Sequence, residues 1–137
     1  MENLVLLHQN DEEIHKKFMM NDLIRWKEEI EIINVEMIFY KNLINAHLKE
    51  LTTWNSADYT QLFNGIADVQ YYNALFQKEF NEFSNKLEGI KECDDLQCET
   101  YFLNDHARFK QNIEKHFSNY KEFKKSIFSY LRTKYNY

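Results

Sequence analysis

The 137-residue sequence contains no proline and only two glycines, the two residue types on which tight turns depend. A β-sandwich or a Rossmann-like domain needs such turns at short intervals, so both classes of fold are nearly excluded. A disordered chain is excluded as well, because 44% of the residues are apolar and include eleven Phe and nine Tyr. The composition therefore predicts an all-α domain.

Long apolar runs and a strong net charge are also missing. No stretch approaches the ~20 apolar residues that span a bilayer, and the opening MENLVLLHQNDEE lacks the basic start of a signal peptide. We therefore expect a cytoplasmic protein with no membrane contact. The net charge of −5 is mild, although residues 99–137 carry eight basic and four acidic side chains. Complementarity to the more acidic preceding segments accounts for this basic third, so we do not expect nucleic acid as a partner.

Cysteine is scarce, with Cys93 and Cys98 in the polar segment KECDDLQCET. Two cysteines are too few for a disulfide scaffold, and a reducing cytosol would keep them as thiols. A metal site that joins them to His106 would lack a fourth ligand. We therefore expect free thiols here and neither a metal nor another cofactor.

Three long segments repeat apolar residues at alternating spacings of three and four, which is typical of amphipathic helices. They predict helices over residues 22–51, 57–91 and 100–134. The first stripe consists of Leu23, Trp26, Ile30, Ile33, Met37, Tyr40, Ile44, His47 and Leu51. Apolar residues flank this stripe at Ile32, Val35, Ile38, Phe39 and Leu43, so we expect each helix to contact more than one partner.

The connectors between these helices are short, so neighbouring helices must be antiparallel. Residues 1–20 have helical spacing, but their register does not continue into Leu23. We expect a short fourth helix that folds back near residues 19–22. The alternative is a bent extension of the first long helix that packs on a second subunit. The predicted fold is an antiparallel up-and-down bundle of three long helices plus a short N-terminal helix, in a single domain over residues 1–137.

Gly65 lies in the interior of the second predicted helix, beside the stripe residue Ile66. A glycine at such a position costs about 1 kcal/mol relative to alanine. The sequence therefore indicates that another helix approaches closely there. Gly89 lies near the predicted end of the same helix, where glycine is typical of a helix terminus.

Polar residues occupy four stripe positions where Leu or Phe is expected, namely His47, Asn73, His106 and His116. Antiparallel alignment of the helices places Glu36, Asn73 and His116 at about the same height. One interpretation is a buried layer of hydrogen-bonded side chains that sets the helix register. The other is a small-ligand or metal site formed by these three residues inside the bundle. We favour the structural layer and keep the ligand site as the alternative.

Catalytic motifs are missing. The sequence has no glycine-rich phosphate loop and no Gly-x-Ser-x-Gly elbow. A di-iron bundle needs two Glu-x-x-His motifs, and only the segment from Glu12 to His15 has that form. We therefore do not expect an enzyme.

The aromatic content exceeds what the interior of a thin bundle can hold. Candidates for the surplus are Trp54, Tyr71, Tyr72, Tyr101, Tyr135 and Tyr137. Tyr and Trp are enriched in protein interfaces. We therefore expect a non-enzymatic protein that acts through protein–protein contacts with a partner of unknown identity, above all as a two-fold homodimer.

The segment WKEEIEIINVEMIFY, which spans residues 26–40 and is followed by Leu43, resembles the first long helix of small uncharacterised helical proteins from Bacteroidetes. In those proteins a Trp, acidic residues, an apolar pair, an inner Glu and a Phe recur in that order. The resemblance covers about residues 22–51. It implies a cytoplasmic helical bundle and carries no activity and no functional residues.

Overall fold

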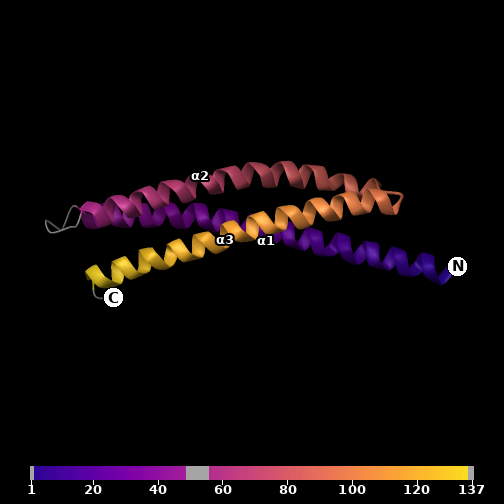
Figure 1. The fold of residues 1–137 in the computed structure, drawn as a ribbon, viewed down its shortest axis with the longest axis horizontal. Coiled ribbons are helices and arrows are strands. Elements are labelled where there is room, and N and C mark those ends of the chain that lie inside the picture. The colour runs from indigo at the N-terminus through magenta and orange to yellow at the C-terminus, as the bar shows by residue number, and fades with distance from the viewer. Residues whose placement is uncertain (1, 49–55, 136–137) are drawn as a thin grey trace.

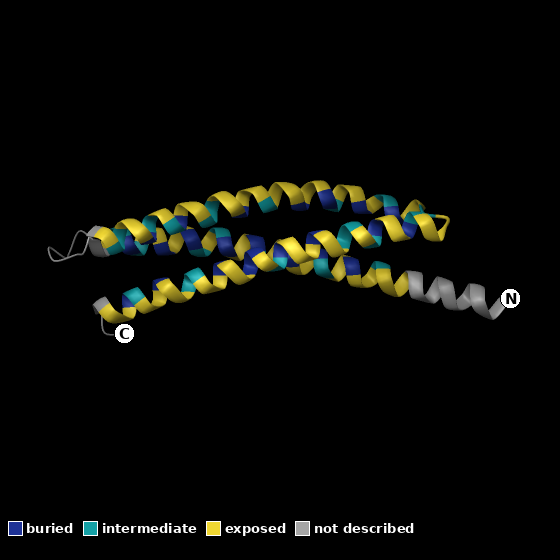
Figure 2. Ribbon diagram, in the orientation of Figure 1, coloured by how far each residue is buried: buried dark blue, intermediate teal, exposed yellow. Residues whose placement is uncertain are grey.

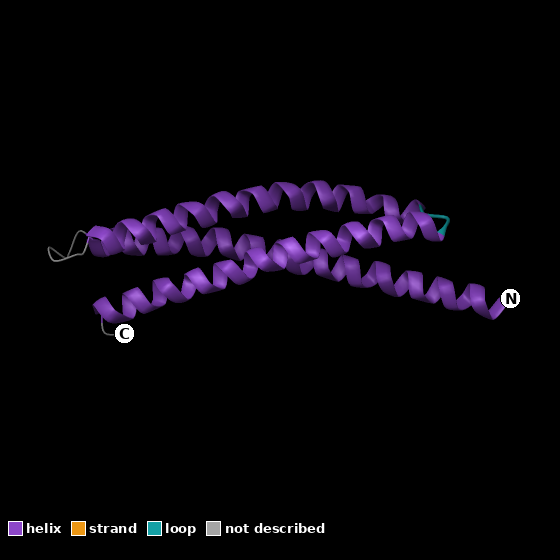
Figure 3. Ribbon diagram, in the orientation of Figure 1, coloured by secondary structure: helices purple, strands orange, loops and turns teal. Residues whose placement is uncertain are grey.

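The computed structural model describes the backbone of residues 2–48 and 56–135, and the side chains of residues 13–46 and 57–133. All of the regular structure in these segments is helical, and they contain no strand (Figure 3). The elements in chain order are α1 (Glu2–Leu48), α2 (Ser56–Leu87), the 3-10 helix η1 (Glu88–Glu92) and α3 (Leu96–Tyr135). The all-α prediction is therefore confirmed.

The three long helices form an elongated bundle in which sequence neighbours run antiparallel (Figure 1). Each long helix contacts the other two. The N-terminal end of α1 extends beyond the turn that joins α2 to α3, and α3 crosses α1 on its way to the opposite end (Figure 1). The α2–α3 turn contains η1 and a short loop, in which the Asp95 carboxylate accepts the Cys98 N–H at 2.8 Å and caps the start of α3.

The core is built from the predicted stripes, which face inward along the bundle (Figure 2). The described members of the first stripe are all buried: Leu23, Trp26, Ile30, Ile33, Met37, Tyr40 and Ile44. The side chains of His47 and Leu51 lie outside the described residues. Burial of one face of each helix, rather than helix propensity, is what stabilises helices of this length in water.

The predicted short N-terminal helix is wrong, because α1 continues without a break from Glu2 to Leu48. Its stripe extends backward to Met19, which is only 2% exposed and lies one turn before Leu23. The segment contains no Gly or Pro that would end a helix, so nothing interrupts the hydrogen-bond ladder at residues 19–22. The bundle therefore has three helices where the sequence predicts four. The alternative is matched in that the N-terminal residues extend the first long helix, and its packing on a second subunit stays a prediction.

The expectation of free thiols is also wrong, because Cys93 and Cys98 form a disulfide. Cys93 follows η1 and Cys98 lies in the first turn of α3. The turn brings their Cα atoms to 5.5 Å, which is within the range that a disulfide spans. The bond closes the short loop between α2 and α3.

The close helix approach predicted at Gly65 is confirmed. A Cβ atom built on Gly65 would lie 2.2 Å from Cε2 of Phe123, a ring carried by α3. The missing side chain of α2 therefore makes room for an aromatic ring of α3.

We predict that Gly65→Ala lowers the free energy of unfolding by about 1 kcal/mol. Overpacking against Phe123 costs ~1–3 kcal/mol, and the gain in helix propensity offsets about 1 kcal/mol of that cost. In a Phe123→Ala background the same change should stabilise the protein by about 1 kcal/mol, because only the propensity gain remains. Urea unfolding of the four proteins measures both effects. Stabilisation by Gly65→Ala in the presence of Phe123 would show that the ring moves aside freely.

Candidate functional site

A buried polar layer joins the three helices near the middle of the bundle. Asn73 of α2 is fully buried and His116 of α3 is 7% exposed. The amide nitrogen Nδ2 of Asn73 donates hydrogen bonds to the Ile30 carbonyl at 3.0 Å and to Asn34 Oδ1 at 2.8 Å, both on α1. His116 Nε2 lies 2.9 Å from Asn73 Oδ1. Two of the three residues predicted to form the layer are therefore in direct contact.

The hydrogen bonds determine the state of the His116 ring. Because Asn73 Oδ1 can only accept, Nε2 of His116 carries the proton, and Nδ1 is the acceptor of the neutral imidazole. Burial lowers the pKa of His116 below its ordinary value, which favours this neutral form. The Phe76 ring stacks on the imidazole with a centroid distance of 4.6 Å. The layer thus presents a neutral histidine held on one edge and one face.

Glu36 has other partners than the two predicted for it. Its carboxylate accepts hydrogen bonds from the Tyr120 hydroxyl and from Lys124 Nζ, both on α3. Burial acts to raise the pKa of Glu36, but these two donors lower it below its ordinary value. Burial and the neighbouring carboxylate in turn raise the pKa of Tyr120. Glu36 therefore forms a separate ion pair between α1 and α3 and does not contact His116.

His106 lies near the N-terminal end of α3, where it contacts two residues of α1. Its Nε2 lies 2.9 Å from Asp22 Oδ2, and its ring stacks on Trp26 at 5.4 Å. Burial lowers the pKa of His106, although Asp22 acts in the opposite direction. Within the described residues, no three His, Cys, Asp or Glu side chains come together as metal ligands would.

A groove of about 410 Å³ lies between α2 and α3, beside the polar layer. Residues on its walls include Tyr72, Phe76, Asn112, His116, Asn119 and Tyr120. Within the described residues His116 makes its hydrogen bond through Nε2, and the residue lines the groove together with aromatic, amide and charged side chains. The His116 ring nitrogen can accept a hydrogen bond from a flat ligand that packs against the aromatic walls of the groove.

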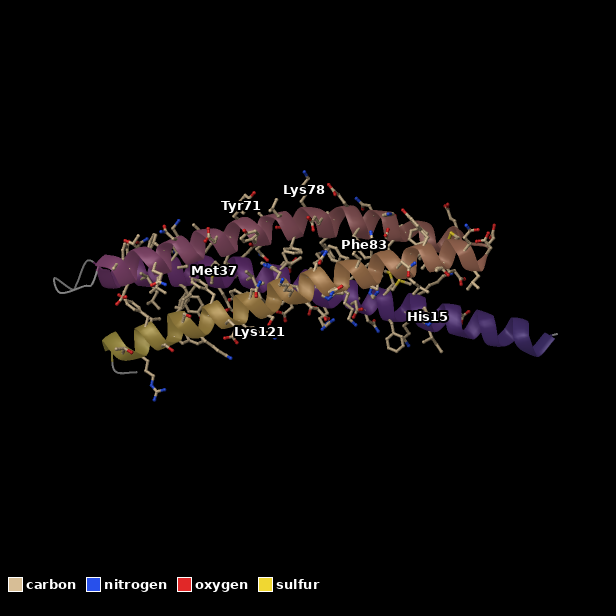
Figure 4. All side chains as sticks on the ribbon, viewed as in Figure 1. His15, Met37, Tyr71, Lys78, Phe83 and Lys121 are labelled. Atoms are coloured by element: carbon tan, nitrogen blue, oxygen red, sulfur yellow. A yellow bond between two sulfur atoms is a disulfide. The ribbon has the colours of Figure 1, made fainter. Side chains whose placement is uncertain are left out.

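The predicted interface tyrosines are exposed but scattered. Tyr71 is 61%, Tyr72 54% and Tyr101 52% exposed. Figure 4 shows Tyr71 on the side of α2 that faces away from the other two helices. The ammonium group of Lys86 lies over the Tyr101 ring, 4.5 Å from its centroid. The side chains of the remaining candidates, Trp54, Tyr135 and Tyr137, lie outside the described residues.

A larger exposed surface lies on α1, opposite its buried stripe, and we call it the outer α1 face. It consists of Ile14, Phe18, Met20, Ile24, Ile32, Val35, Ile38 and Phe39. These side chains are between 45% and 68% exposed. Four of them flank the first stripe in the sequence, where they predict contacts with a further helix. The sequence therefore already indicated this apolar surface, and neither α2 nor α3 covers it.

No family model, no curated protein and no solved structure matches this chain. Its resemblance to helical proteins of Bacteroidetes therefore stays a prediction. In the parts of the chain that the structure describes, no helix has the length and apolar character needed to cross a bilayer.

We predict that the protein loses stability as the pH falls from about 7.5 to about 5.5. The pKa of His116 is lower in the folded state than the ~6.5 of an unfolded chain, so the unfolded chain binds more protons in this window. The contribution of neutral His116 to stability is complete above its pKa in the unfolded chain. It is lost as the pH falls through its pKa in the folded protein. Chemical unfolding at a series of pH values measures this slope.

The variant His116→Gln should flatten part of that dependence, and His106→Gln should flatten another part, because burial lowers the pKa of both rings. The matched control is His15→Gln, since His15 is exposed. An equal slope in the His116 and His15 variants would contradict the neutral, buried state of His116.

Proposed function

We propose that this protein is a non-enzymatic interaction module that self-associates through the outer α1 face. The observation that carries the proposal is the exposure of large apolar side chains along one side of one helix. Phe18 is 64%, Val35 68% and Phe39 58% exposed. Apolar surface exposed in this way marks contact sites, because its removal from water is favourable by about 25 cal/mol per Å².

The architecture supports α1 as the contact element. The helix has 47 residues, whereas α2 has 32, so its N-terminal part has no α2 beside it (Figure 1). A helix that is apolar on opposite faces is expected to be covered on both. The bundle covers one face, and a second copy of the chain would cover the other.

The outer α1 face supports self-association better than the exposed tyrosines do. Tyr71, Tyr72 and Tyr101 each expose a ring with a polar hydroxyl, and they lie on two different helices. The α1 residues are aliphatic or phenyl groups on a single helix, and no neighbouring helix shields them. Such groups gain more from burial than tyrosine, whose hydroxyl needs a hydrogen-bond partner once buried.

We predict that the wild-type protein is a dimer in sedimentation velocity experiments and that Val35→Lys weakens the dimer at least about tenfold. The substitution replaces an apolar side chain of the contact with a charged one, which costs free energy to bury. Because Val35 is 68% exposed within the chain, the fold and its thermal unfolding should be unaffected. Tyr71→Lys, at an equally exposed position of α2, is the matched control and should leave the dimer intact. A wild-type protein that stays monomeric at all concentrations would refute self-association.

A second function is favoured by the groove beside His116. We propose that it binds a flat aromatic molecule that carries an N–H donor. The support is the acceptor Nδ1 of a neutral histidine, next to the rings of Phe76, Tyr72 and Tyr120 on the walls of a groove of about 410 Å³. A ring of this kind would stack on the aromatic walls while its N–H points to Nδ1.

Indole and indene provide a matched pair of probes, because the two molecules have the same shape but only indole has an N–H. We predict that indole binds about fivefold more tightly, since one hydrogen bond is worth about 1 kcal/mol. Titration followed by NMR should move the Nδ1 resonance of His116 with indole and leave it nearly unchanged with indene. Equal affinity for both probes, or shifts elsewhere in the bundle, would contradict the proposed site.

A further inference from the structure

The sequence intervals between residues along the outer side of α1 are the same whether they are counted from the N-terminus or from the C-terminus. Starting at Ile14 and ending at Phe39, the positions on this side follow gaps of four, three, four, three, four, three and four. The positions are Ile14, Phe18, Asn21, Arg25, Glu28, Ile32, Val35 and Phe39. Residues three and four apart share one side of a helix. Because the series of gaps is palindromic, the stripe can lie on an antiparallel copy of itself with every position matched.

The chemistry of the matched positions agrees with this symmetry. With the two-fold axis between residues 26 and 27, Ile14 lies opposite Phe39 of the second copy, and Phe18 lies opposite Val35 of the second copy. At the centre, Arg25 lies opposite Glu28 of the second copy, and symmetry repeats each pair. The apolar ends therefore meet apolar ends and the central Arg25 and Glu28 meet opposite charge, while Asn21 lies opposite Ile32 of the second copy.

The charge of α1 changes sign at the same axis. Residues 15–27 contain four basic side chains and one acidic side chain, whereas residues 28–40 contain four acidic side chains and no basic one. An antiparallel copy places the basic half of each helix over the acidic half of the other. A parallel copy would place like charges over each other, which is unfavourable. The charge distribution thus selects the antiparallel orientation.

The surface of α1 has a groove at the position that Phe18 of the second copy occupies in this register. A shallow groove of about 360 Å³ is lined by Glu28, Glu31, Ile32, Val35 and Glu36. In the antiparallel register, Phe18 of the second copy faces Val35 in this groove. Its neighbours Lys17 and Arg25 then face carboxylates on the groove walls. An apolar floor between acidic walls suits a phenyl group flanked by basic side chains.

Registers shifted by one heptad lose this agreement. A shift in one direction places Val35 opposite Arg25 of the second copy, and a shift in the other places Phe18 opposite Glu28. Both shifts set apolar side chains against charges and separate Arg25 from its acidic counterpart. The side chain of Arg25 is 54% exposed, so it can receive a third carboxylate besides its intrachain partners Asp22 and Glu114.

We propose that two copies of the chain pair through their α1 helices in an antiparallel two-fold arrangement whose axis lies between Trp26 and Lys27. The proposal rests on the proposed self-association and adds its partner, orientation and register. The occupant of this stripe, which includes five of the eight residues of the outer α1 face, is thus the same stripe of a second copy, and the interface is isologous.

Reversal of the central charges tests the register. Arg25→Glu alone sets Glu against Glu, and Glu28→Arg alone sets Arg against Arg, so each homodimer should weaken at least about tenfold. An equimolar mixture of the two variants contains only opposite pairs at these positions. It should form a heterodimer within about threefold of the wild-type affinity. Sedimentation equilibrium gives all four dissociation constants, and thermal unfolding checks that each variant is folded.

Cross-linking provides a second measurement that does not depend on the Arg25 contacts. Phe18→Cys and Val35→Cys are placed on separate chains that also carry Cys93→Ser and Cys98→Ser. Mild oxidation should join the two chains only in the mixture, because residue 18 of one copy lies opposite residue 35 of the other.

The outcomes separate the inference from the proposed function. Cross-linking of Val35→Cys to itself would show a parallel dimer or an antiparallel dimer whose axis lies at Val35. A wild-type dimer whose charge-reversed mixture is no stronger than the single variants would show another register. Either result would overturn this inference and leave self-association standing. A monomeric wild-type chain, or capture of a different protein by an otherwise monomeric α1, would overturn both.

Discussion

The structure depends on a mismatch between the apolar surface of α1 and the helices available to cover it. Its inward stripe, from Met19 to Ile44, is fully covered by α2 and α3. Its outer side carries Phe18, Val35 and Phe39, and no neighbouring helix shields them. Two helices can enclose only one side of a third, because ridges-into-grooves packing places each neighbour at about 8–10 Å on the facing side. The shape of the bundle and its proposed self-association both follow from this geometric limit.

Specific polar contacts, rather than apolar burial, fix the position of each helix along its neighbours. Asn73 joins the Ile30 carbonyl and Asn34 to His116, so a shift by one turn would leave several buried polar groups without partners. Gly65 also fixes the position of α3 along α2, because the Phe123 ring can approach α2 so closely only where a side chain is missing. Apolar stripes alone would tolerate such shifts, since one Leu or Ile replaces another at little cost.

Much of the interior could be predicted from the sequence, because helical periodicity is a local property. The first stripe, the buried position of Asn73 and His116, and the close approach at Gly65 all follow from spacing along single helices. The partner of Glu36 could not be predicted in this way. Tyr120 lies one turn beyond His116 on the same helix, and the relative height of two helices depends on the turn between them.

The sequence by itself determined the secondary structure and which side of each helix is buried, because both depend on residues three and four apart. The tertiary structure alone decided that Cys93 meets Cys98 and that neither α2 nor α3 covers the apolar flank of α1. These features depend on where the turns place distant residues and on how many helices are present to cover a surface. The periodicity of a single segment encodes neither the placement of distant residues by the turns nor the number of helices that cover a surface.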